Sequence, residues 1–538
     1  MAGTILGVES VPDGLANGLL AGVNPVAGLY AYLYGLVGGA LVTGSGLMAV
    51  QGTGAMAIIV SDVDLDSTDD PMRSLFTLTV LTGVVMVAAG LLGLARFLRF
   101  VSTSVMTGFV TAVGINIVLG QLDNLTGYVS HGANRVLRAL DLLLHPWAID
   151  PATLLVGALT ILGILGLRHT RLGAMGLVVA VAATSLLALA LNSAGSDVAV
   201  VADVADVPRS LPAPVLPALG EIPWLLLPAL SLAFVGLVQG AAVASAFPAR
   251  HGAARPDASQ DFVGQGAGNL LSGLFQGNPV GGSMGASSLV ATAGAHGRRA
   301  LLVGAAVMAV VIFALAPVVE RVAMPSLAGL LIVVGAGAVR IPQIVAAFRT
   351  GPVPVAVMVV TFALTLVVPL QYAVLVGVGM SVLMFVIQQS TRLTLRRLTL
   401  DEQGRVIEGP PPSTLPPRTV VVLQPYGPLF FASTDALHRQ LPSVTARSQG
   451  SVVILRIRGA DEAGLTLLDA LDDYASELRE TGSRLVVVTD NPRLTAQLRR
   501  HRTGRTLGLE RVYEGTEVVG EALTRAVADA RAWIARQS

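Results

Sequence analysis

A chain of 538 residues that is 53% hydrophobic and only 13% charged, with a mean hydropathy of +0.70, is too apolar for a soluble protein. The composition therefore indicates a polytopic protein of the lipid bilayer. A net charge of +1 without a basic face argues against nucleic acid as a partner, and the absence of cysteine excludes disulfides and cysteine metal sites. No metal and no cofactor are expected.

The apolar runs predict fourteen membrane segments. They lie at 4–22, 26–44, 50–60, 74–95, 104–120, 151–168, 173–192, 224–247, 259–275, 286–295, 298–317, 324–340, 352–369 and 371–388. Arginine, the strong cation of this lysine-free sequence, gathers in the even-numbered loops, whereas odd-numbered loops such as 61–70 are acidic. Both termini are therefore expected in the cytoplasm, and the protein in the inner membrane of a bacterial cell.

Two of these segments, 50–60 and 286–295, are too short to cross the bilayer. About ten residues of helix span roughly 15 Å, half of a hydrocarbon core of about 30 Å. Each is the third of seven segments, so the chain divides into two repeats, 1–195 and 222–390, with opposite orientations in the membrane. Such paired half-helices indicate a binding site near the middle of the bilayer.

Both half-helices follow glycines and a hydroxyl side chain, in VQGTGAM (50–56) and GNPVGGSMGASS (277–288). These sequences leave backbone N–H groups open, and two facing helix N-termini present positive dipole ends that suit an anion. The alternative is that the small residues only permit close helix packing. The anion-binding residues predicted in the two motifs are Gln51, Gly52, Thr53, Gly54, Gly282, Ser283, Gly285, Ala286 and Ser287.

Asp13 follows Pro12 in the first span and is the one acid assigned to the interior of the predicted core spans. Carboxylates inside a membrane are costly and usually functional. We therefore expect Asp13 to exchange a proton and to couple proton movement to anion movement. The alternative is that Asp13 hydrogen-bonds backbone groups freed by Pro12. Glu9 is expected nearer the interface.

After Thr391 the apolar character ends. The basic and then proline-rich stretch 391–417 is predicted to be a linker between the membrane domain, 1–390, and a separate cytoplasmic domain, 418–538. In that domain, strand-like runs at 419–423, 451–457 and 484–490 alternate with helical stretches at 462–480, 493–503 and 517–536. The alternation predicts a small α/β fold.

Several of these segments resemble the sulfate permease (SulP) family of anion transporters. The resemblance rests on VPDGLANGLLAGVNPVAGLYAYLYG (11–35), VMTGFVTAVGINIVLGQLDNLTG (105–127), GQGAGNLLSGLFQGNPVGGSMGASSLVATAGA (264–295) and PLQYAVLVGVGMSVLMFVIQQS (369–390). Two tail segments, GPLFFASTDAL (427–437) and VVILRIRGADEAGLTLLDAL (452–471), are similar to the family's STAS domain. The resemblance implies a core subdomain (spans 1–4 and 8–11) that moves like an elevator against a gate subdomain (spans 5–7 and 12–14). A STAS domain that supports a homodimer is expected.

The chain departs from the family at two positions of the expected site. Many members have an acid in span eight, where this chain has Gln239, so sodium coupling is not expected. Many also have an arginine where this chain has Ala286, which removes a fixed positive charge. Thr53, by contrast, stands where bicarbonate-type bacterial members have a threonine that contacts the anion.

The function expected is secondary active transport of a small anion such as sulfate, bicarbonate or a dicarboxylate. An uncoupled anion channel or exchanger would use the same site and remains an alternative. A nucleobase permease shares the membrane fold but would normally have carboxylates in spans eight and ten, where this chain has Gln239 and no acid. An enzyme is not expected, because the apolar part lacks a His, Ser and Asp arrangement that could form a nucleophile.

Overall fold

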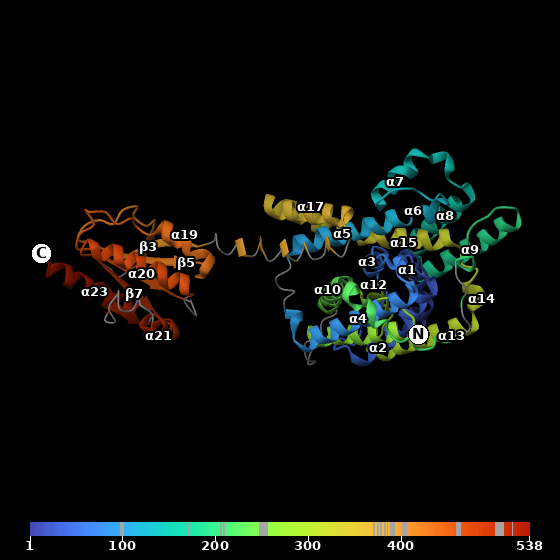
Figure 1. The fold of residues 1–538 in the computed structure, drawn as a ribbon, viewed down its shortest axis with the longest axis horizontal. Coiled ribbons are helices and arrows are strands. Elements are labelled where there is room, and N and C mark those ends of the chain that lie inside the picture. Colours follow the sequence, from blue (N-terminus) through green and yellow to red (C-terminus); the bar gives the residue numbers. More distant parts are fainter. Residues whose placement is uncertain are drawn as a thin grey trace. The chain divides into compact units, whose positions relative to one another are not determined.

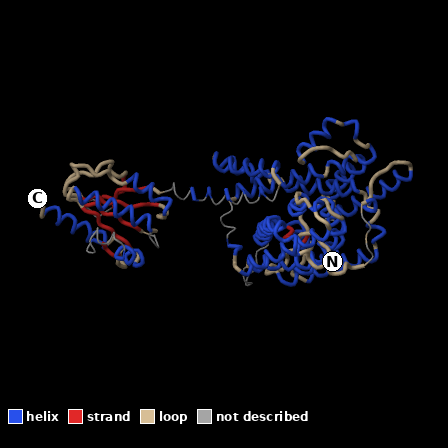
Figure 2. The backbone as a smooth tube through the Cα atoms, in the orientation of Figure 1, coloured by secondary structure: helices blue, strands red, loops and turns tan. Residues whose placement is uncertain are grey.

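The computed structural model divides the chain into two compact units, Met1–Ser381 and Val382–Ser538. The first is helical with one short strand pair, and the second is built around a sheet (Figure 2). The structure describes residues 1–96, 102–170, 172–173, 175–204, 207, 210–246, 257–369, 372–373, 376, 379–380, 383–384, 386–387, 393–400, 406–458, 464–500, 511–518 and 520–537.

The first half of the helical unit contains α1 (Ala2–Leu20), α2 (Pro25–Val42), α3 (Gly54–Ser61), α4 (Pro71–Leu91), α5 (Thr103–Gly120), α6 (Leu122–Thr126), α7 (Arg135–Leu144), α8 (Pro151–Leu167) and α9 (Met175–Ser193). The second half contains α10 (Ile222–Ala246), α11 (Ala258–Leu274), α12 (Met284–Thr292), α13 (Arg299–Ala314), α14 (Ala316–Val319), α15 (Met324–Ala338), α16 (Ile341–Thr350) and α17 (Pro352–Val367). The bounds follow local sequence: Asn24, Asp70 and Asp150 cap helices that begin with proline, and each side chain accepts a backbone N–H.

The apolar helices make this unit a multi-pass membrane domain. Among the described residues, six helical stretches are long and apolar enough to cross a bilayer, at 25–42, 71–91, 103–126, 175–193, 219–244 and 324–350. Shorter apolar helices lie at 151–167, 299–314 and 352–367. The predicted fourteenth span, 371–388, falls largely outside the described residues.

Two groups of helices pack among themselves. One consists of α1, α2, α4, α10, α11 and α13, with α3 and α12 against α1 and α10, and the other of α5, α8, α9, α15 and α17 (Figure 1). These groups coincide with the spans that the sequence analysis assigns to the core and the gate. They meet where α1 contacts α9 and α15 and where α3 contacts α5.

Glycines allow α1 and α2 to pack backbone to backbone. A Cβ atom on Gly28 would lie 2.0 Å from the carbonyl oxygen of Gly14, so no larger residue fits there without separating the helices. The close approach brings the polar side chains of α1 and α2 within hydrogen-bonding reach of the loop that precedes α3. A sequence rich in small residues is thus used here for helix packing, as in other membrane bundles.

The C-terminal unit is a six-stranded sheet in the order β4-β3-β5-β6-β7-β8. Its strands are β3 (Thr394–Leu400), β4 (Val406–Gly409), β5 (Val420–Tyr426), β6 (Val452–Ile457), β7 (Arg484–Thr489) and β8 (Val512–Glu514). Strands β5 to β8 are parallel, and β3 pairs antiparallel with both β4 and β5. The helices are α19 (Thr434–Gln440), α20 (Leu465–Glu480), α21 (Pro492–Arg500) and α23 (Glu521–Ala535). Residues of α20 and α23 contribute to separate apolar clusters with the sheet, which confirms the predicted α/β alternation.

The predicted linker 391–417 is wrong over much of its length, because β3 and β4 lie within it. Leu393, Leu395 and Leu398 of this segment are buried with the sheet. The stretch TLRRLTL does not alternate strictly, because Arg396 and Arg397 are adjacent, so it lacks the two-residue period of a strand and has the composition of a basic linker.

This register predicts where the C-terminal unit can be cut. A fragment of residues 393–538 should be soluble and folded, whereas 418–538 should aggregate, because loss of β3 exposes the edge of β5. Size-exclusion chromatography and circular dichroism of the two fragments check this. A soluble, monomeric and folded 418–538 would show that β3 is dispensable.

Candidate anion site between two half-helices

Two short strands bring the predicted half-helices together. β1 (Ala49–Gln51) pairs antiparallel with β2 (Gly281–Ser283), with Ala49 opposite Ser283 and Gln51 opposite Gly281. Helix α3 begins three residues after β1 ends and α12 directly after β2, and α1, α3, α10 and α12 lie together in Figure 1. The pairing therefore places two helix N-termini on either side of one strand pair. Because the strands are antiparallel, the open N–H groups and positive dipole ends of the two helices lie at opposite ends of this pair.

The two hydroxyl residues of the motifs are the caps of these helices. Thr53 caps α3 by accepting the N–H of Met56 at 3.4 Å, and Ser283 caps α12 by accepting that of Ala286 at 3.3 Å. The Thr53 hydroxyl also donates to Gln239 Oε1 at 3.1 Å. Thr53 is thus in contact with Gln239 of α10, whereas Ser283 lies opposite Ala49, at the other end of the strand pair.

Gln51 and Ser287 tie the strand pair to its surroundings. Gln51 Nε2 donates to the Ser10 hydroxyl at 2.7 Å, and the Ser287 hydroxyl accepts the N–H of Ala49 at 3.0 Å. Both side chains are buried, with 1% and 0% of their area exposed. Their polar groups therefore fix β1 against α1 and α12, and a charge introduced at Ser287 would disrupt packing.

Glycines pack β2 tightly against α10, whereas the first turn of α12 is exposed. A Cβ atom on Gly282 would lie 3.0 Å from Cα of Gly240, so β2 and α10 touch through their backbones. Gly285, in the first turn of α12, is exposed, and a Cβ atom there would meet nothing within 4 Å. A larger side chain would therefore fit at Gly285.

A polar stripe on α11, which the sequence analysis missed, supports β2. Gln265 Oε1 accepts the N–H of Gly282 at 2.9 Å, while the Asn269 amide exchanges hydrogen bonds of 2.9 and 2.6 Å with the backbone of Val280. Asp261, one turn earlier, accepts from the N–H and hydroxyl of Ser45 at 2.7 and 2.6 Å. These residues recur every four positions in an apolar span, which was the available signal.

Asp261 also corrects the prediction that Asp13 is the one acid inside a core span. It lies in α11 with 1% of its area exposed. Its two carboxylate oxygens accept hydrogen bonds from Ser45 in the turn after α2, so Asp261 links that turn to α11. Asp13 has a different environment.

Asp13 is linked through Tyr32 to Gly52 and Thr53, the predicted anion-binding residues between β1 and α3, which are called the anion loop below. The Tyr32 hydroxyl lies 2.6 Å from Asp13 Oδ2 and 2.9 Å from the carbonyl oxygen of Gly52, and it accepts from Asn17 Nδ2 at 2.6 Å. Tyr32 is completely buried. Asp13 thus lies one side chain away from the residue that precedes the Thr53 cap.

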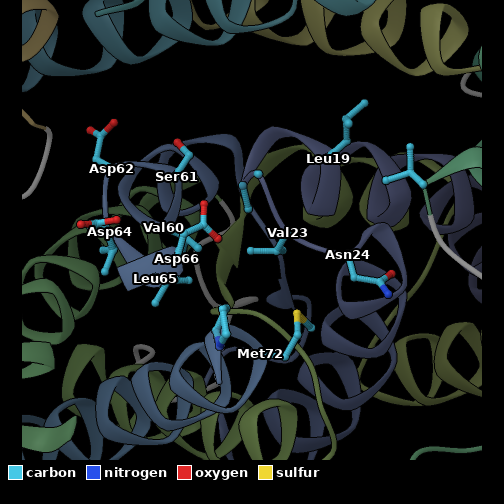
Figure 3. Close-up of a pocket in the computed structure, with 15 residues that line it drawn as sticks. Leu19, Val23, Asn24, Val60, Ser61, Asp62, Asp64, Leu65, Asp66 and Met72 are labelled. Atoms are coloured by element: carbon cyan, nitrogen blue, oxygen red, sulfur yellow. The ribbon is translucent and has the colours of Figure 1, made fainter. Parts of the chain in front are cut away.

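A cavity of about 780 Å³ lies at the other end of α3. Figure 3 shows its lining, which includes Asp62, Asp64 and Asp66 on the left of the view and Asn24 on the right. Acidic side chains at the C-terminal end of a helix repel anions, so this cavity is less suited to an anion than the N-termini of the half-helices. Arg135 of α7 closes over this end of α3, with Nη2 2.8 Å from Asp62 Oδ1 and 2.7 Å from the Ser61 hydroxyl.

This pair of half-helices within a helical membrane domain defines a class of membrane transport protein, and comparison with known proteins gives the family. Residues 1–361 match the model of the sulfate permease family, to which the chain belongs. It is 27% identical over 392 residues to YbaR of Bacillus subtilis (strain 168), named for sulfate transport, covering 72% of this chain and 76% of YbaR. It is 24% identical over 510 residues to the bicarbonate transporter BicA of Picosynechococcus sp., covering 90% of this chain and 87% of BicA.

Solved structures show the same fold. Murine Solute Carrier 26 family member A9, an anion transporter in its inward-facing state, superposes with a TM-score of 0.83 over 99% of this chain and 90% of that one, at 18% identity. The transmembrane domain of a cyanobacterial BicA gives a TM-score of 0.60 at 21% identity, over 71% of this chain and 95% of that one.

Proposed function

We propose that this protein is a secondary active transporter of a small anion, bound between the N-termini of α3 and α12. The observation that carries the proposal is the β1–β2 pairing, which brings the two capped N-termini to one strand pair. Backbone N–H groups, the Thr53 and Ser283 hydroxyls and the dipole ends would bind the anion without a fixed positive charge. Ala286, where an arginine would be expected, fits such a site.

Transport would proceed by movement of the core helices, which carry the site, against the gate helices. The separate packing of the two helix groups supports this elevator-like motion. Contacts between them would have to break in each cycle, among them those of α3 with α5. We further propose a fourteen-span inverted repeat in a bacterial inner membrane with both termini in the cytoplasm.

Asp13 would supply proton coupling. It is linked to the anion loop by hydrogen bonds through Tyr32, whereas Asp261 is held by the turn after α2. Gln239 offers a neutral carbonyl where a cation site would favour a carboxylate, so sodium would be dispensable. The C-terminal unit would be a STAS domain that supports a homodimer.

Purified protein in liposomes tests the proposal. Radiolabelled sulfate, bicarbonate, chloride and a dicarboxylate are offered with an imposed pH gradient, with or without sodium. Accumulation of one of them above its equilibrium level, driven by the pH gradient and indifferent to sodium, is expected. Downhill flux alone, at rates far above carrier turnover, would identify an anion channel instead.

A further inference from the structure

We propose that the Tyr32 hydroxyl transmits the protonation state of Asp13 to the anion loop, and that the conformation described here is the one in which Asp13 carries a proton. This inference rests on the proposed proton-coupled transport and deepens it by naming the residue that joins the two sites. It follows from counting the protons available to one buried hydroxyl.

Three polar groups surround the Tyr32 oxygen. They are Asn17 Nδ2 at 2.6 Å, Asp13 Oδ2 at 2.6 Å and the Gly52 carbonyl oxygen at 2.9 Å. Asn17 Nδ2 also donates to the backbone carbonyl of Asp13 at 3.0 Å. The amide nitrogen must therefore face this side, because an amide oxygen there would confront a carbonyl. Asn17 is a donor to Tyr32.

A phenol hydroxyl has one proton to donate, and the Gly52 carbonyl can only accept. If Asp13 is ionised, its carboxylate can also only accept. The single Tyr32 proton can then be donated either to Asp13 or to the Gly52 carbonyl, and the other of these two oxygens lies close to the Tyr32 oxygen with no hydrogen between them. If Asp13 is protonated, it donates to Tyr32, and Tyr32 donates to Gly52. Each contact then has a hydrogen, as buried polar groups require.

The carbonyl that Tyr32 binds belongs to the anion loop. Gly52 directly precedes Thr53, the cap of α3. The ring and the loop are in contact, because a Cβ atom on Gly52 would lie 2.8 Å from Tyr32 Cε2. Loss of the proton from Asp13 would draw the Tyr32 proton to the carboxylate and release Gly52. The loop geometry that binds the anion is therefore favoured when Asp13 is protonated.

Few other titratable groups face Asp13. On α1 itself there are Glu9, one turn away, and the terminal amine of Met1. The helices packed against α1 are α2, α3, α9, α12, α13 and α15. Their titratable side chains are Tyr30, Tyr32 and Tyr34 of α2 and Arg299 at the start of α13. Of these tyrosines, Tyr32 is the one hydrogen-bonded to Asp13.

The test measures binding of sulfate and chloride, neither of which changes its charge between pH 5.5 and 8. In the parent protein the anion dissociation constant should fall about tenfold as pH drops through this range, and by linkage the anion should favour protonated Asp13. Asp13→Asn and Tyr32→Phe should each reduce this dependence to less than twofold. The matched control is Tyr34→Phe. Tyr34 lies on the same helix, but its ring stacks on Phe275, so this variant should keep the tenfold change in dissociation constant with pH.

Infrared spectroscopy supplies a second readout. The carboxyl band of protonated Asp13, identified by its loss in Asp13→Asn, should shift when anion binds to the parent and should not shift in Tyr32→Phe. If the parent's affinity for sulfate or chloride does not vary with pH, the proposed proton coupling is wrong and this inference fails with it. If Asp13→Asn removes the dependence but Tyr32→Phe retains it, coupling stands and the role of Tyr32 is overturned.

Discussion

Gly285→Glu is expected to abolish anion binding while the protein stays folded. Gly285 lies in the first turn of α12, exposed and next to open space, so the longer side chain fits. Its carboxylate would accept the same N–H groups as the anion and repel the anion directly. At an effective dielectric near 20, two unit charges about 6 Å apart repel by about 3 kcal/mol, which raises the dissociation constant about a hundredfold.

Gly285→Gln is the matched control, because it has the same length without the charge. It should weaken binding of sulfate and chloride less than tenfold, and both variants should elute and melt like the parent. Ser287→Glu is a poorer test, because Ser287 is completely buried and binds the backbone of Ala49. Equal affinities in the Glu and Gln variants at position 285 would place the anion elsewhere.

Asp13→Asn should remove uptake driven by a pH gradient. An amide at this position can still hydrogen-bond Tyr32, so the helices stay packed, but it cannot release a proton. Anion exchange between loaded liposomes should continue, because the site between α3 and α12 is intact. Undiminished pH-driven uptake by this variant would exclude Asp13 as the coupling group.

Asp261→Asn separates coupling from folding. Asp261 accepts from the backbone N–H and hydroxyl of Ser45, and an amide there could keep both contacts only as neutral hydrogen bonds, with the Ser45 hydroxyl accepting from Nδ2. The expected result is a loss of about 1–3 kcal/mol of stability, seen as a lower melting temperature. The protein that remains folded should retain pH-driven uptake. Loss of coupling with unchanged stability would reverse the roles assigned to Asp13 and Asp261.

Much of the helical unit could be predicted because its signals are local. The breaks at VQGTGAM and GGSMGASS identified both half-helices and the hydroxyl before each, and the structure shows that Thr53 and Ser283 cap them. Their pairing through β1 and β2 was not predictable in the same way, because three-residue strands have no period and their partners are more than two hundred residues apart. The sequence indicates where backbone N–H groups lack helical partners, but which groups lie opposite them depends on tertiary contacts.

The residues that support the site were missed for a related reason. Gln265 binds β2, Asn269 binds the backbone just before β2, and Tyr32 binds Gly52. These partners come together only in a fold in which α2 and α11 flank the strand pair. The spacing of Asp261, Gln265 and Asn269 was visible, but an apolar span with polar residues every fourth position also describes ordinary helix packing. The strand β3 was concealed by its arginines, which gave the segment the composition of a linker.

Anomalous diffraction from crystals soaked separately in bromide and selenate, which replace chloride and sulfate, tests the central claim most directly. The account predicts an anomalous peak beside the β1–β2 pair, within hydrogen-bonding distance of hydroxyl or N–H groups at the start of α3 or α12, absent in Gly285→Glu. A peak elsewhere in the helical unit, unchanged in that variant and with none beside the β1–β2 pair, would contradict it.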